Sequence, residues 1–129
     1  NIQCSSITKG SGNFKIDHPV PEKKDTHWLY HSFVESPTAG DNIYRYEIET
    51  KNLEYVIYLE EYHKYLNTNY QVWVNPAWIE MPWGRGIGYV KDNKVFIKVD
   101  IDGKYNILVI ATRMDSCATN NWKGVEVKK

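Results

Sequence analysis

The sequence has no excess of charge of either sign and no long apolar segment. Its 129 residues include 16 basic and 16 acidic side chains, so the formal net charge is zero. A chain without a long-range field is not steered toward nucleic acid or an anionic membrane, which argues against a general polyanion binder. No apolar run approaches the roughly 20 residues that span a bilayer, so we expect neither nucleic-acid binding nor membrane insertion.

Cysteine is scarce, and internal repeats and low-complexity segments are absent. Cys4 and Cys117 are the two cysteines, and they are compatible with one disulfide between the two ends or with two buried thiols. A chain of this length buries an adequate core without metals or several disulfides, so we expect one domain. Residues 9–12 have the flexible composition of a linker, which predicts a linker or the end of an upstream region at 1–12 and a single β domain at 13–129.

The first residues do not resemble a secretion signal. Residues 1–4 lack the basic-then-apolar layout of a signal peptide. Because the first residue is not Met, we expect the chain to be part of a longer protein.

Alternating apolar and polar residues predict strands through most of the chain. The clearest alternation is at residues 43–49, where Tyr44, Tyr46 and Ile48 share one face. Similar patterns occur at residues 14–17, 28–35, 53–59, 70–75, 87–91, 94–100 and 105–113. Seven or eight short strands at this spacing predict an all-β fold, an antiparallel β-sandwich or jelly-roll-like barrel.

The segments between the strands predict how they are joined. The turn at residues 50–52 predicts a hairpin over residues 43–59, and Asp92-Asn93 predicts a second hairpin. Leu59, Tyr62, Tyr65 and Leu66 recur at helical spacing, which predicts one short helical segment near 59–67. The prolines between residues 11 and 37 predict no helix there. Residues 124–127 fit either a final edge strand or a segment that wraps a neighbour.

Three short motifs near the amino terminus resemble one protein family. They are Lys-Ile-Asp-His-Pro at residues 15–19, Pro-Glu-Lys-Lys at 21–24 and His-Ser-Phe-Val-Glu-Ser-Pro at 31–37. Together they resemble a signature near the carboxyl end of phage and large-virus tail-fibre or surface-fibre proteins, which also occurs in some bacterial repeat-bearing surface proteins. The resemblance covers about a quarter of the chain, and after Asn42 only the strand order and a segment near 59–67 are similar.

The resemblance implies a non-catalytic module of a virion fibre or spike, located on the virion surface or otherwise extracellular. By this resemblance, the module is expected to attach the virion to the host or to assemble the fibre tip. It is expected to do so as a homotrimer that contacts other virion proteins. Two alternatives remain open: a trimerisation cap or chaperone of the fibre, and a polysaccharide-degrading enzyme domain. An enzyme would bring together at least two of the carboxylates of Glu35, Glu60, Glu61, Asp100 and Asp102.

The remaining chemical motifs favour structural roles over catalysis or cofactor binding. Residues 84–88, Gly-Arg-Gly-Ile-Gly, lack the Lys-Ser/Thr of a phosphate loop and precede a strand, so we interpret them as a loop that needs positive φ. In a strand, His27 and His31 would lie about 13 Å apart, which is too far to share a metal ion. We therefore expect no metal, no cofactor and no catalytic residue.

Aromatic side chains are more abundant than a core of this size needs: ten Tyr, five Trp and three Phe. Trp78 and Trp83 lie in a segment rich in proline and glycine, where side chains are presented rather than buried. With Arg85 beside them, they are the predicted binding residues, and a host cell-surface glycan is the candidate ligand. The alternative is that they cover an open end of the sandwich or a subunit interface.

The signature residues Asp17, His18, His31 and Glu35 are predicted to be structural. Short polar residues beside prolines commonly bond turn amides that have no ladder partner. We expect Asp17, His18 and Glu35 to bond the backbone or each other, and so to hold residues 19–26 against the strand that follows.

Overall fold

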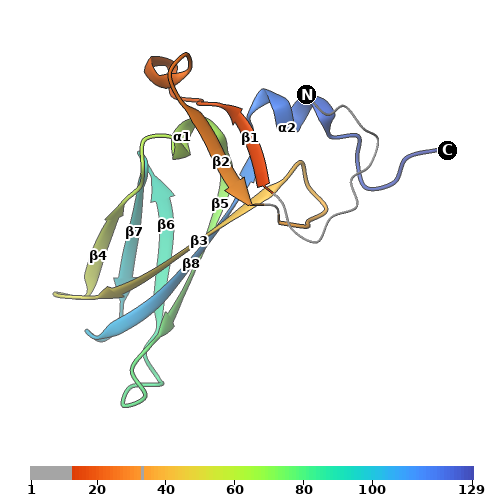
Figure 1. Ribbon diagram of the computed structural model, residues 1–129. Coiled ribbons are helices and arrows are strands. Elements are labelled where there is room, and N and C mark those ends of the chain that lie inside the picture. The colour runs from red at the N-terminus through yellow and green to blue at the C-terminus, as the bar shows by residue number, and fades with distance from the viewer. Residues whose placement is uncertain (1–12, 33) are drawn as a thin grey trace.

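The computed structural model describes residues 13–32 and 34–129 and has an all-β architecture (Figure 1). Eight strands, two short helices and one 3₁₀ turn at Pro21–Lys23 make up the described chain. The strands are β1 (Asn13–Asp17), β2 (Trp28–Ser32), β3 (Asp41–Glu49), β4 (Glu54–Tyr58), β5 (Asn67–Pro76), β6 (Gly86–Lys91), β7 (Lys94–Val99) and β8 (Lys104–Arg113). The helices are α1 (His63–Leu66) and α2 (Ser116–Asn121).

Two antiparallel three-stranded sheets form a sandwich, as the sequence predicts. One sheet has the order β3–β8–β5 and the other has the order β4–β7–β6. A separate hairpin, β1–β2, lies at one end of the sandwich (Figure 1). The expected all-β sandwich with one short helical segment near 59–67 is therefore confirmed, since α1 lies within that segment.

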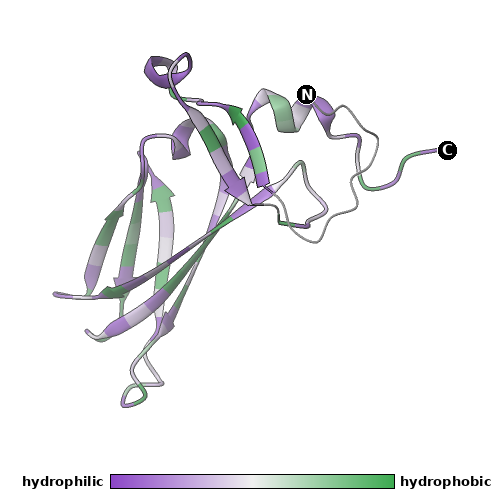
Figure 2. Ribbon diagram, in the orientation of Figure 1, coloured by the Kyte–Doolittle hydropathy of each residue, from purple (hydrophilic) through white to green (hydrophobic). Residues whose placement is uncertain are grey.

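The core lies between the two sheets. It is built by buried aliphatic residues from both, such as Ile107 and Val109 of β8 facing Val95 and Ile97 of β7. Figure 2 shows the alternation of apolar and polar residues along these strands. A smaller apolar cluster joins the β1–β2 hairpin to α1. It consists of Phe14 and Ile16 from β1 and Leu66 from α1.

The predicted hairpin over residues 43–59 is wrong. Strand β3 pairs with β8 over its whole length, and β4 pairs with β7 in the other sheet. The backbone N–H of Thr50 donates to the carbonyl of Gly103 (2.8 Å). The buried Thr50 hydroxyl also forms hydrogen bonds with the backbone of Gly103. Residues 50–53 thus turn the chain from one sheet into the other, with positive φ at Asn52 and Leu53.

The predicted hairpin around Asp92-Asn93 is confirmed. Strands β6 and β7 pair in register from Gly86↔Val99 to Lys91↔Lys94. Asp92 and Asn93 have φ of 52° and 59°, as a tight two-residue turn requires. The Asn93 amide also donates to the carbonyl of Leu59 (3.2 Å), which connects this turn to the end of β4.

The glycines of residues 84–88 permit close packing and do not supply positive φ, contrary to our interpretation. Among the described glycines only Gly40 and Gly124 have positive φ. A Cβ atom at Gly88 would lie 2.5 Å from Cγ1 of Val72, so glycine lets β6 lie directly against β5 where the two sheets meet.

Several boundaries differ from the sequence prediction. Strand β2 ends at Ser32 instead of continuing to Glu35, and a 3₁₀ turn begins at Pro21, where the chain bends between β1 and β2. Helix α2 was not predicted, and residues 124–127 form no strand. The expectations for residues 1–12, Cys4 and Phe33 lie outside the described residues.

Candidate functional site

Residues 77–85, which we call the tip loop, connect β5 to β6. Pro76 ends β5, and the Ala77 N–H donates to the Lys104 carbonyl (2.7 Å). Within the loop the Met81 N–H donates to the Trp78 carbonyl (3.2 Å), and the Gly84 N–H donates to the Met81 carbonyl (3.1 Å). These bonds give the loop two consecutive tight turns with a fixed conformation.

Met81 holds the tip loop against the core. Its side chain is only 4% exposed and belongs to the main core cluster. A Cβ atom at Gly103 would overlap the Met81 side chain and would lie 3.3 Å from Cε3 of Trp78. The absence of a side chain at Gly103 therefore allows both residues to pack over the turn before β8.

Ile79 and Trp83 project into solvent, whereas Trp78 is only partly exposed because it also packs over the turn at Gly103. Trp78 is 39% exposed, Trp83 is 62% exposed and Ile79 is 88% exposed. The loop lies at the end of the sandwich opposite the β1–β2 hairpin and α2 (Figure 1). The structure thus presents the two predicted tryptophans, with Ile79, on a loop whose backbone is fixed.

Arg85 and its neighbours close the base of the tip loop. The Arg85 N–H donates to Oδ1 of Asp100 (2.8 Å), and the Asp100 N–H donates back to the Arg85 carbonyl (2.9 Å). The guanidinium Nε lies 3.8 Å from Asp100 Oδ2, and the Arg85 side chain is highly exposed. Arg85 therefore remains accessible beside Trp83, while its backbone fixes the start of β6.

Two of the five carboxylates that an enzyme would use accept backbone amides at turns. Asp100 accepts the Arg85 amide, as described above. Asp102 accepts the amides of Asn52 (3.1 Å) and Leu53 (2.8 Å) at the corner between the sheets. Glu60 and Glu61 are exposed residues before α1. Within residues 13–32 and 34–129, no group of three or more His, Cys, Asp or Glu side chains is arranged to hold a metal ion.

The signature residues lie at the opposite end of the molecule from the tip loop. His18 is nearly buried, and its ring Nδ1 accepts a hydrogen bond from the Val20 backbone N–H (3.2 Å). The backbone N–H of His18 donates to the His27 carbonyl (3.2 Å). This is the type of backbone contact predicted for His18. Asp17 is exposed at the end of β1.

His31 connects the β1–β2 hairpin to the sandwich through hydrogen bonds. Its Nδ1 lies 2.6 Å from the Tyr30 carbonyl oxygen, which requires a proton on Nδ1. Nε2 then accepts from the Tyr44 hydroxyl (3.0 Å), and that hydroxyl accepts from the Asn67 amide (3.0 Å). Burial lowers the pKa of His31 and raises that of the Tyr44 phenol, so both groups are neutral near pH 7.

His63, which the sequence analysis did not select, lies at the centre of this cluster. It is 1% exposed, and its ring centre lies 4.2 Å from that of Tyr44 and 4.8 Å from that of Tyr62. Its Nδ1 is buried and has no hydrogen-bond partner among the described residues. Burial, with a smaller effect of His31, lowers the pKa of His63 to about 4. His63 lies four residues after Leu59 and three before Leu66, a helical spacing that would place it on the same face, but no motif indicated its aromatic neighbours.

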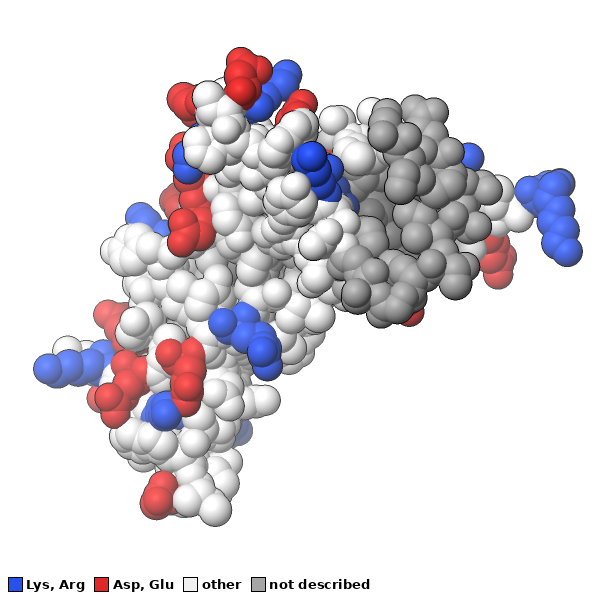
Figure 3. All heavy atoms as spheres, in the orientation of Figure 1, with Lys and Arg blue, Asp and Glu red and all other residues white. Residues whose placement is uncertain are grey.

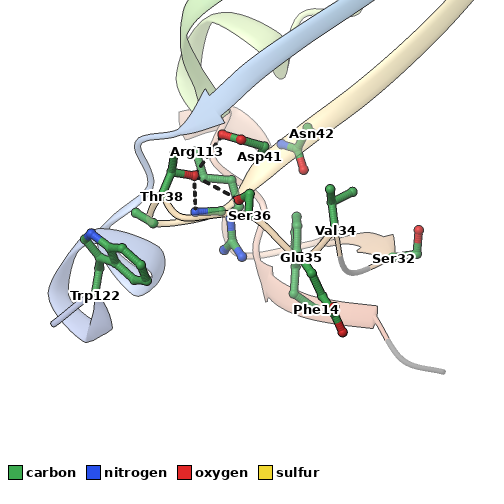
Figure 4. A pocket seen from close by; sticks show the side chains of 12 residues that line it. Phe14, Ser32, Val34, Glu35, Ser36, Thr38, Asp41, Asn42, Arg113 and Trp122 are labelled. Atoms are coloured by element: carbon green, nitrogen blue, oxygen red, sulfur yellow. Dashed lines mark hydrogen bonds between the residues drawn. The ribbon is translucent and has the colours of Figure 1, made fainter. Parts of the chain in front are cut away.

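Glu35 lines a pocket of about 360 Å³ between β2, the start of β3 and α2 (Figure 4). Asp41 and Arg113 also line this pocket, and both are bonded within the protein. Asp41 accepts the hydroxyls of Thr38 (2.8 Å) and Thr112 (3.0 Å). The Arg113 guanidinium donates two hydrogen bonds to the Asp115 carboxylate (2.8 and 2.7 Å) and lies 3.7 Å from the ring centre of Phe14. The pocket also includes Trp122, and neither Arg113 nor Trp122 was selected from the sequence.

Comparisons with known proteins do not assign the chain to a family. No family model, no curated protein and no solved structure matches it. The described residues contain no helix that is long and apolar enough to cross a membrane.

Proposed function

We propose that this domain is a non-catalytic part of a virion fibre or spike, and that it attaches to a host surface through the tip loop. The observation that carries the proposal is the exposure of Trp78 and Trp83 on a loop fixed by backbone hydrogen bonds and by buried Met81. A fixed loop loses little conformational entropy on binding. The resemblance of the amino-terminal motifs to fibre proteins supports the virion-surface assignment.

The chemistry of the tip loop favours a glycan as ligand. Tryptophan combines a broad apolar face with a polar N–H, which suits sugar rings and wet interfaces. Arg85 adds an exposed donor beside Trp83. Acidic and basic side chains are interspersed on the face shown in Figure 3, so the charge distribution gives no support to nucleic acid as partner.

The engagement of two of the five candidate carboxylates in turns favours the non-catalytic assignment over a polysaccharide-degrading enzyme. Asp100 and Asp102 accept backbone amides at turns. A glycosidase instead needs a free pair of carboxyl groups on either side of the scissile bond. A role in fibre assembly is compatible with the same fold, and the binding experiment separates it from attachment.

The test is binding of the 129-residue chain to an array of cell-surface glycans. We expect Trp83→Ala and Trp78→Ala to weaken binding to the recognised glycans at least tenfold while the melting temperature stays close to that of the parent. Trp28→Ala is the matched control, since Trp28 is 56% exposed on β2 at the other end of the molecule. Equal binding by all three variants, or no binding by the parent, would contradict attachment through the tip loop. Loss of oligomers instead of loss of binding would assign the loop to assembly.

A further inference from the structure

The outward side of the β4–β7–β6 sheet is partly apolar. The residues at its centre are Val56, Phe96 and Tyr89, which form one cross-strand row. The rings of Phe96 and Tyr89 stack at 5.3 Å, and Tyr89 is 53% exposed. Ile87 and Tyr58 flank this row and are 70% and 75% exposed. We call this surface the first outer face.

Lysines surround the apolar row of the first outer face. In the strand register, Lys98 of β7 lies opposite Glu54 of β4, and Lys94 of β7 lies opposite Lys91 of β6. The Lys94 ammonium lies 5.7 Å from the ring centre of Tyr58. The face thus carries three lysines against one glutamate.

The outward side of the β3–β8–β5 sheet is also apolar at its centre, and we call it the second outer face. Its two central cross-strand rows are Arg45–Leu108–Trp73 and Ile43–Ile110–Gln71. Ile43 is 47% exposed and Trp73 is 44% exposed. Hollows of about 520 and 460 Å³ lie on either side of the centre, the first lined by Glu47 and Leu108 and the second by Gln71 and Ile110.

Two apolar outer faces on one small sandwich indicate contacts with other chains. An antiparallel sheet that faces water normally carries polar residues outward. Exposed Tyr, Trp and Ile gathered at the centre of a face are instead typical of protein interfaces. Since the two faces differ in shape and charge, they suit contact with each other better than contact of each face with itself.

We propose that the domain self-associates by packing the first outer face of one copy onto the second outer face of the next copy. The lysines of the first outer face would then meet a face that carries the acidic Asp41, Glu47 and Glu49 and the basic Arg45 and Lys104, of which Lys104 is ion-paired with Glu47 (2.6 Å). The projecting Tyr58, Ile87 and Tyr89 would meet the two hollows. Contact of the first outer face with itself would instead bring two sets of three lysines together, which is unfavourable.

Such a contact is heterologous, since it uses two different surfaces of the same chain. A heterologous contact that closes after a few copies gives a ring. The inference goes beyond the proposed function, which concerns attachment, and it does not depend on ligand binding by the tip loop.

The test uses two double variants, each of which removes one face. Ile87→Lys with Tyr89→Thr changes the first outer face, and Ile43→Lys with Trp73→Thr changes the second. By sedimentation velocity we expect the parent to form oligomers as its concentration rises and each double variant to stay monomeric. An equal mixture of the two variants should form a 1:1 dimer, because each supplies the face that the other lacks.

Ile79→Lys is the matched control, since it places a lysine at a more exposed apolar residue outside both faces. It should associate like the parent, and circular dichroism should show that every variant is folded. A parent that stays monomeric would overturn the proposal. So would double variants that keep the parent's size, or a mixture that yields no dimer. Trp83→Ala should associate normally even if it loses glycan binding, so failure of the tip-loop proposal would be seen separately.

Discussion

At the scale of single residues, three of the four histidines are fully or partly buried and neutral near pH 7. Burial lowers the pKa of His18, His31 and His63, which all lie between the β1–β2 hairpin and the sandwich. In each case the neutral form packs against aromatic rings or accepts a hydrogen bond. The stability of this junction therefore depends on the protonation of these rings.

His63 should make the protein less stable in mild acid. In the unfolded chain its pKa is about 6.5, whereas in the folded protein it is about 4. As the pH falls from 6.5 to 4, the unfolded chain binds a proton that the folded protein does not, so the free energy of unfolding falls. The loss should reach about 3 kcal/mol at pH 4. We expect His63→Phe to reduce this loss, measured by urea unfolding between pH 7 and 4.

His27→Ala is the control for this titration, because His27 is exposed. Its pH profile should follow that of the parent. A His63→Phe profile as steep as the parent's would show that other groups cause the acid sensitivity.

His18 should stabilise the turn that follows it. His18→Ala leaves the Val20 amide without its acceptor, and Val20 is 1% exposed. We expect a loss of about 1–3 kcal/mol in the free energy of unfolding. His27→Ala, on the same hairpin but exposed, should change stability by less than about 0.5 kcal/mol. Equal melting of His18→Ala and the parent would remove the structural role assigned to His18.

At the scale of elements, the β1–β2 hairpin is attached to the sandwich by a few specific contacts. It shares no ladder with either three-stranded sheet. These contacts include the hydrogen bond of His31 to Tyr44, the packing of Phe14 and Ile16 against Leu66, and the position of Arg113 over Phe14. Arg113 is held by Asp115, which also caps the amino terminus of α2. Arg113, at the end of the last strand, thus helps to fix the position of the first hairpin.

Removing one hydroxyl should loosen the hairpin selectively. Tyr44→Phe deprives His31 of its nearer donor and Asn67 of an acceptor, both in a largely buried setting. We expect a loss of about 1–3 kcal/mol in global stability. Amide hydrogen exchange should become faster in β2 more than in β7.

Tyr58→Phe is the matched control, since Tyr58 is 75% exposed. It should leave both stability and exchange unchanged. Uniformly faster exchange in Tyr44→Phe would mean that the hairpin does not open separately from the sandwich.

At the scale of the whole molecule, the two ends of the sandwich differ in structure. One end carries the hairpin, α2 and the buried histidine cluster, and the other carries the exposed tip loop (Figure 1). The sheet faces between them remain partly apolar. A module with this arrangement can contact neighbouring copies through its sides and present the tip loop at its free end.

Binding by the tip loop should depend little on salt. The net charge is zero, and stacking of Trp78 and Trp83 on a sugar does not require ion pairs. We expect affinity for the glycan selected on the array to change less than about threefold between low and physiological ionic strength. A steep loss of affinity with salt would indicate that Arg85 and other charged groups supply most of the binding energy.

The sequence alone determined the local structure of much of this protein. Alternation identified β3 and β8, Asp92-Asn93 identified the β6–β7 hairpin, and helical spacing identified α1. These features depend on a few neighbouring residues, whose side-chain period and turn preference act locally. The same reasoning selected Trp78 and Trp83, because proline and glycine keep their segment out of regular structure.

The tertiary structure decided which strands pair and which side chains meet. The turn at residues 50–52 is compatible with a hairpin. In the structure, buried Thr50 instead bonds Gly103, which lies just before β8. Strands β3 and β4 therefore belong to different sheets. Likewise, His31, Tyr44 and His63 meet because three separate segments converge. Local patterns determine which way a side chain faces, whereas its partners depend on contacts between residues far apart in the chain.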